Sequence, residues 1–98
     1  MGRQTTTLWD PATHLKSDAD MAAYLQAALE ENDPTLVAAA LGDIARARGM
    51  SQLARDTGLG RESLYKALSA SGNPELATVL KVIAALGLKL QASPADAA

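Results

Sequence analysis

The sequence predicts an all-α fold, a five-helix bundle, from three observations. Alanine and leucine, two of the strongest helix formers, account for 36 of the 98 residues. The aromatic residues that strands favour are scarce, with no Phe, one Trp and two Tyr. Apolar residues recur every three or four positions, as in amphipathic helices, in several segments between residues 17 and 87.

The chain is expected to form one domain with two short ends. Residues 1–16 lack helical periodicity and are expected to be an N-terminal arm, residues 17–93 the folded domain, and residues 94–98 a disordered tail. Trp9, in the arm, is interpreted as a packing anchor or as a contact to a partner or second subunit. Because so small a chain buries only about 60–65% of its unfolded surface, a homodimer is expected.

The first two predicted helices are marked by their caps. Ser17 precedes two acids at the start of a helix whose apolar stripe runs over Met21–Leu29. Asp33 caps the next helix, and Pro34 occupies its first position, where the missing N–H costs nothing. Gly49 is expected to end this helix with a positive φ. The second stripe comprises Leu36, Val37, Ala40, Leu41, Ile44 and Ala45.

Two short helices follow, and their spacing is typical of a helix-turn-helix. Ser51 is expected to cap a helix over 52–57, and a second helix over 61–68 follows a turn at Gly58. This glycine supplies the positive φ that the turn needs, and Ala54 is small where the two helices pack together. The second helix then presents outward the positions that meet base edges in the major groove. The predicted DNA-binding residues are Ser51, Gln52, Arg55, Arg61, Glu62, Ser63, Tyr65 and Lys66.

A fifth helix and a short strand complete the prediction. The helix is expected to be capped by Asn73, to end at Gly87, and to bury Leu76, Val79, Leu80, Ile83, Ala84 and Leu86. Residues Leu88–Ala92 alternate apolar and polar side chains, which predicts a terminal β-strand. A strand needs a partner for its backbone groups, so pairing with Thr5–Trp9 or with a second copy is expected.

Charge is distributed unevenly along the chain. Residues 1–45 contain two basic and seven acidic residues, a net charge of −5. Residues 46–98 contain seven basic and four acidic residues, a net charge of +3. A locally basic face can bind DNA on an acidic protein because its field acts within about a Debye length. Arg46, Arg48 and Lys81 are therefore expected to flank the helix-turn-helix with further phosphate contacts.

Composition argues against other classes of protein. The chain has no cysteine and one histidine, which excludes disulfides, thiol catalysis and Cys-bearing zinc sites. His14 has no accompanying nucleophile, and Glu30-Glu31 has no Glu-x-x-His partner, so neither catalysis nor a metal or other cofactor is expected. No signal peptide and no apolar run of about 18 residues is present, so a cytoplasmic protein without a membrane partner is expected.

The run from Gly42 to Ser71, followed by Gly72 to Gly87, resembles the probable addiction-module antidote proteins. These are antitoxins of HigBA-like toxin–antitoxin pairs, close to the Xre group of phage-repressor-like regulators, and Tyr24 to Pro34 also resembles them. The resemblance implies a lambda-repressor-like DNA-binding domain, a partner toxin similar to a small RelE-like ribonuclease, and repression of the shared operon. The stretch Gly49–Ala54 is shorter than in typical Xre domains, which shortens the first helix of the motif.

The sequence therefore predicts an antitoxin that binds operator double-stranded DNA as a homodimer, neutralises a cognate toxin and represses its own operon. Two alternatives remain open at this point. One is a stand-alone prophage-type transcriptional regulator, which the absence of a toxin-sized neighbouring gene would indicate. The other is a helical protein-interaction adaptor, which would not shift its own promoter DNA in a gel.

Overall fold

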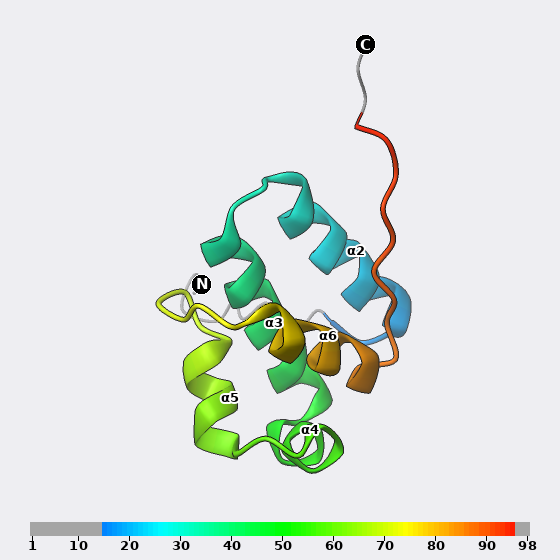
Figure 1. Cartoon of the computed structure of the whole chain (residues 1–98). Helices are drawn as coiled ribbons and strands as arrows, with labels where there is room; N and C mark the ends of the chain where they lie inside the picture. The colour runs from blue at the N-terminus through cyan, green and yellow to red at the C-terminus, as the bar shows by residue number, and fades with distance from the viewer. Residues whose placement is uncertain (1–14, 96–98) are drawn as a thin grey trace, which may run out of the picture.

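The computed structural model describes residues 15–95 and confirms the all-helical class (Figure 1). In this part of the chain five helices follow one another: α2 (Asp18–Glu30), α3 (Pro34–Arg48), α4 (Met50–Thr57), α5 (Arg61–Ala67) and α6 (Leu76–Ala85). Residues 1–14 and 96–98, with the predictions made for Trp9, His14 and the strand partner Thr5–Trp9, lie outside the described residues.

Helices α2 and α3 form an antiparallel pair, and α4, α5 and α6 gather around the far end of α3 (Figure 1). Both predicted caps of the pair are confirmed. The Ser17 hydroxyl oxygen accepts the backbone N–H of Asp20 at 3.1 Å, and the Asp33 carboxylate accepts that of Thr35 at 2.9 Å. These side chains satisfy backbone donors that the first turn of a helix leaves unpaired.

The core lies where α3 meets the other helices. Its largest side chains below 2% exposure come from α3, α4, α5 and the end of α6: Leu41, Ile44, Leu53, Leu64, Val82 and Leu86. Leu15, just before α2, is also buried against this core. Burial of this apolar surface ties the three short helices to the longer pair.

Gly42 permits the close approach of α3 to the end of α5. A Cβ built at this position would overlap the backbone carbonyl oxygen of Leu68, far inside van der Waals contact. Any side chain here would push α5 away from α3, because the obstacle is backbone and cannot rotate aside. No local pattern signals this close approach, because Leu68 lies 26 positions further along the chain.

The predicted buried face of α6 is partly wrong. Val82, Ile83 and Leu86 are buried, whereas Leu76 is 69% and Leu80 is 47% exposed. Ala84, also predicted to be buried, is exposed. The helix is apolar around most of its circumference, so periodicity alone does not identify which side faces the core. In α3 the same ambiguity leaves Leu36 42% exposed, while Ala38 is buried.

Two predicted caps are wrong for a geometric reason. Helix α4 begins at Met50 with Gly49 as its N-cap, so Ser51 lies inside the first turn. Gly49 turns the chain with φ 118°, which lets α4 start immediately after α3 without a linker. Helix α6 has Glu75, not Asn73, as its N-cap. Within residues 15–95, no side-chain hydrogen bond caps the start of α4 or of α6.

The predicted terminal strand is not borne out in residues 15–95. A Schellman motif ends α6, with the N–H of Leu88 bonded to the carbonyl oxygen of Ile83 at 3.1 Å and Gly87 at φ 77°. Beyond it, residues 88–95 run beside α2 without strand structure (Figure 1). Alternation of apolar and polar residues produces a strand only where another strand edge accepts its hydrogen bonds, and residues 15–95 offer none.

Candidate nucleic-acid interface

The turn between α4 and α5 has the geometry that the sequence predicted. Gly58 adopts the left-handed conformation, with φ 75° and ψ 10°, and its N–H donates to the carbonyl oxygen of Ala54 at 2.9 Å. The Thr57 hydroxyl donates to the carbonyl oxygen of Leu53 at 2.8 Å and accepts the N–H of Leu59 at 3.3 Å. The chain therefore leaves α4 and enters α5 along a path fixed by hydrogen bonds.

Apolar contacts fix the angle between the two helices. Leu53 on α4 and Leu64 on α5 are each 1% exposed, and Leu59 packs half-buried against the same core. Ala54 is also half-buried and packs against the same core. The α4–α5 unit is thus packed on the core, which fixes the positions of its outward side chains relative to one another.

All eight side chains predicted to bind DNA are exposed, three on α4 and five on α5. On α5 the Arg61 guanidinium lies 5.7 Å from the centre of the Tyr65 ring, a cation–π contact between residues one helical turn apart. Tyr65 is itself 45% exposed. This contact directs Arg61 along the outer surface of α5, while Glu62, Ser63 and Lys66 complete the exposed side of the helix.

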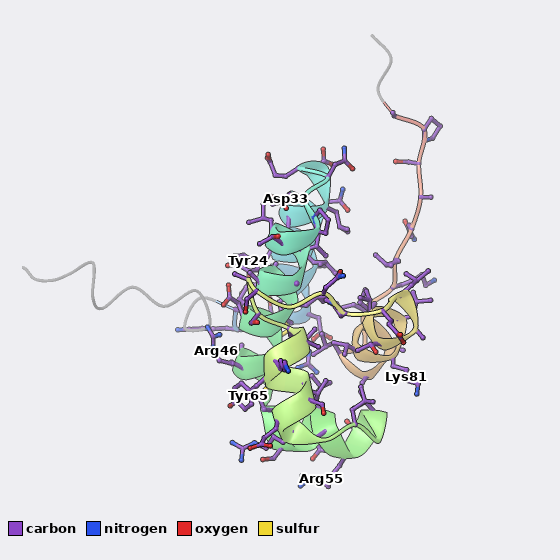
Figure 2. All side chains as sticks on the ribbon, turned by 60° about the vertical axis from the view of Figure 1, so that its left-hand side comes forward. Tyr24, Asp33, Arg46, Arg55, Tyr65 and Lys81 are labelled. Atoms are coloured by element: carbon purple, nitrogen blue, oxygen red, sulfur yellow. The ribbon has the colours of Figure 1, made fainter. Side chains whose placement is uncertain are left out.

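The exposed side of α4 carries a chain of side-chain hydrogen bonds. Gln52 donates from its amide nitrogen to Asp56 at 2.9 Å, and Arg55 donates to the amide oxygen of Gln52 at 2.8 Å. These bonds hold Gln52 and Arg55 in defined orientations. In Figure 2 Arg55 lies at the foot of the molecule, below Tyr65 on the neighbouring helix.

The three cations expected to flank the motif lie in different surroundings. Arg46 pairs with Asp43 at 2.8 Å, and Arg48 pairs with Asp18 on α2. Lys81 projects from α6 on the other side of the molecule from Tyr65 (Figure 2). Ion pairs therefore compensate Arg46 and Arg48, and Lys81 lies on a different side of the molecule from Tyr65. Nothing in the local pattern signalled the Asp18–Arg48 pair, because its members lie 30 positions apart.

A comparison with known protein families gives one match that covers most of the chain. Residues 5–94 match the family model described as "Probable addiction module antidote protein". This chain belongs to that family. The match spans every residue predicted to bind DNA. Membership in an antidote family points to an antitoxin role and implies a cognate toxin as partner.

A second comparison finds a relative in Haemophilus influenzae. The chain is 55% identical over 83 residues to a Haemophilus influenzae protein named "Uncharacterized protein", and the alignment covers 85% of this chain and 86% of that protein. No solved structure matches the chain.

Membrane-spanning helices and metal-binding clusters are both absent from the described residues. None of the helices within residues 15–95 is both long and apolar enough to cross a membrane. In the same part of the chain, no three His, Asp or Glu side chains are placed to bind a metal ion together.

Proposed function

We propose that this antidote family member is a DNA-binding antitoxin, which represses its own operon and neutralises a partner toxin. The observation that supports DNA binding best is the α4–α5 unit, because its turn is fixed by Gly58 and its outer side is polar and basic. Arg61 and Lys66 form no ion pair with any residue in the described range 15–95. Their charges are available for phosphate and base edges.

We assign α5 to the major groove. Arg61 is suited to a bidentate contact with guanine, and Glu62 to accepting a hydrogen bond from a cytosine amino group. Tyr65 is suited to packing on a sugar or a thymine methyl group, next to Arg61. Lys66 reaches a phosphate or an adjacent base. We assign Ser51, Gln52 and Arg55, the exposed polar side chains of α4, to contacts with the DNA backbone. Ser63 on α5 is assigned to the backbone as well.

The repressor is proposed to act as a homodimer. Two helix-turn-helix units bind half-sites about 34 Å apart, which a two-fold dimer provides. With no strand in residues 15–95 to join two copies, we assign the contact to α6, whose exposed Leu76 and Leu80 present apolar surface. Leu80→Lys is expected to convert a dimer to a monomer in sedimentation, and an unchanged mass would exclude α6 as the interface.

DNA recognition is tested by comparing promoter DNA from the protein's own gene with a scrambled duplex of equal length. Arg61→Ala is expected to cost about 1–3 kcal/mol on promoter DNA and little on the scrambled duplex. Arg46→Ala is the control, because this arginine pairs with Asp43. Equal losses on both duplexes would make Arg61 a phosphate contact. No preference of the wild-type protein for its promoter would overturn sequence-specific repression.

Toxin neutralisation is tested separately in cells. Expression of the adjacent toxin-sized gene alone is expected to arrest growth, and co-expression of this chain is expected to restore it. Arrest that persists in the presence of soluble antidote would overturn the antitoxin role and favour a stand-alone regulator.

A further inference from the structure

A groove of about 330 Å³ lies between α2 and α3, away from the helix-turn-helix. Four alanines line it, Ala27 and Ala28 from α2 and Ala39 and Ala40 from α3. Leu36 lines it as well, and this side chain is 42% exposed although its sequence position predicted burial. The small alanine side chains leave a hollow in which a larger apolar side chain from another molecule fits beside Leu36.

Acidic groups stand at the edges of this groove. Glu31, at the end of α2, lines it and forms no ion pair with any residue of the described range 15–95. Asp43 lines it as well, where it accepts the Tyr24 hydroxyl at 2.6 Å and pairs with Arg46. An apolar hollow with an uncompensated carboxylate at its edge matches a partner that presents an apolar side chain next to cations.

The wider charge of this region points to the same partner. Residues 15–48, which contain α2 and α3, hold six carboxylates, one lysine and two arginines, a net charge of −3. Residues 49–95 hold five basic and three acidic residues, a net charge of +2. A field of this sign repels DNA phosphates, and two copies that met through this groove would repel each other. A basic protein is attracted.

We propose that the α2–α3 groove binds the partner toxin, a basic protein that inserts an apolar side chain flanked by lysine or arginine. This inference rests on the proposed antitoxin function. The groove reaches from Tyr24 towards Asp33, at the end of the molecule opposite Arg55 (Figure 2). Toxin and DNA therefore occupy separate surfaces, and one chain can hold both at once. An amphipathic helix laid into the groove is the simplest way to present such a side chain.

The test measures binding of the purified product of the adjacent toxin-sized gene by calorimetry. Leu36→Lys and Glu31→Lys are each expected to weaken the complex about tenfold or more, the first because it puts a charge in the apolar hollow and the second because it sets like charges against the partner's cations. Two matched controls lie outside the groove lining: Glu30→Lys repeats the charge change one position earlier on α2, and Leu90→Lys replaces a leucine of similar exposure, 37%. The controls are expected to change affinity by about twofold or less.

The outcomes separate this inference from the proposed function. If the wild-type chain binds the toxin and both groove variants bind as tightly, the groove is not the docking site. If the wild-type chain does not bind the neighbouring gene product, the antitoxin function fails, and the groove loses its partner with it. Retained promoter binding by both variants shows that they are folded, whereas its loss alongside normal melting would assign the groove to DNA.

Two other occupants give distinct results. A groove filled by a second copy would make Leu36→Lys monomeric in sedimentation while the wild type stays dimeric. If residues 1–14 cover the groove, a chain that lacks them should have a lower melting temperature than the wild type. Its melting temperature should then match that of Leu36→Lys. Either result would overturn the toxin assignment.

Discussion

The α2–α3 pair and the α4–α5 unit differ in how their helices are capped and in how their basic side chains are paired. In the pair, side chains cap both helices, and Arg46 and Arg48 are bound to carboxylates. In the α4–α5 unit, neither helix has a side-chain cap within the described residues, and Arg61 and Lys66 have no ion pair there. The first region pairs its arginines with its own carboxylates, while the second leaves Arg61 and Lys66 without an ion pair, although side chains of α4 bond to one another.

The comparison also explains how a chain with a net charge of −2 can present uncompensated cations on one part of its surface. The arginines at the end of α3 are compensated by Asp18 and Asp43, so they add little field. The cations of α4 and α5 lie on exposed surface beyond that compensation. Total charge is therefore a poor guide to function here, and the position of each uncompensated cation is the better one.

The largest expected effect comes from the joint between the two regions. Gly42→Ala places a Cβ against the carbonyl oxygen of Leu68 and forces α5 away from α3. We expect destabilisation at the upper end of the roughly 1–3 kcal/mol range for overpacking, measured by thermal melting. Gly60→Ala is the control, because its Cβ meets only the Ser63 hydroxyl at 3.7 Å. Equal melting of the two variants would show that the regions do not meet through Gly42.

A smaller effect is expected within the helix-turn-helix. Gly58→Val places a β-branched residue at φ 75°, where a Cβ would have open space but strained backbone. We expect a loss of about 1–3 kcal/mol in the free energy of unfolding, from conformation alone. Gly58→Asn separates the causes, because asparagine tolerates this conformation and should recover much of the loss. An unchanged melting temperature for Gly58→Val would contradict the turn geometry.

The smallest effects test the caps directly. Ser17→Ala removes the bond to the Asp20 N–H and is expected to cost about 1 kcal/mol. Gly60→Ser adds a capping hydroxyl at the start of α5, where φ is −68°, and is expected to stabilise by a few tenths of a kcal/mol. Denaturant titration measures both. A lower free energy of unfolding for Ser17→Ala and a higher one for Gly60→Ser would support the difference in capping between the two regions. A lower value for Gly60→Ser would count against it.

The local signals in the sequence predicted much of this structure. Ser17, Asp33 and Gly58 act through neighbours within four positions, so a pattern was enough to place them. The buried side of α6 was missed because Leu76, Leu80 and Val82 are all apolar and only tertiary contacts choose among them. The exposed side chains of α4 and α5 were foreseen, although their contacts with DNA stay a prediction.

Features that depend on distant parts of the chain were not predictable from pattern. The Asp18–Arg48 pair joins two helices, and the fit of Gly42 depends on where the end of α5 lies. The strand failed for the same reason: residues 88–92 have the right alternation, but no edge in residues 15–95 pairs with them. The α2–α3 groove is also tertiary, since Leu36 reads as core in sequence yet lies 42% exposed.

The most direct test of the contrast is the salt dependence of promoter binding. The logarithm of the affinity falls with the logarithm of salt concentration by roughly 0.9 for each phosphate neutralised. Lys66→Ala is expected to flatten this slope by about 2 in a dimer, one contact for each protomer. Arg48→Ala, whose charge is bound to Asp18, is expected to leave the slope unchanged. A slope that Arg48→Ala flattens as much as Lys66→Ala, or a wild-type affinity indifferent to salt, would contradict the account.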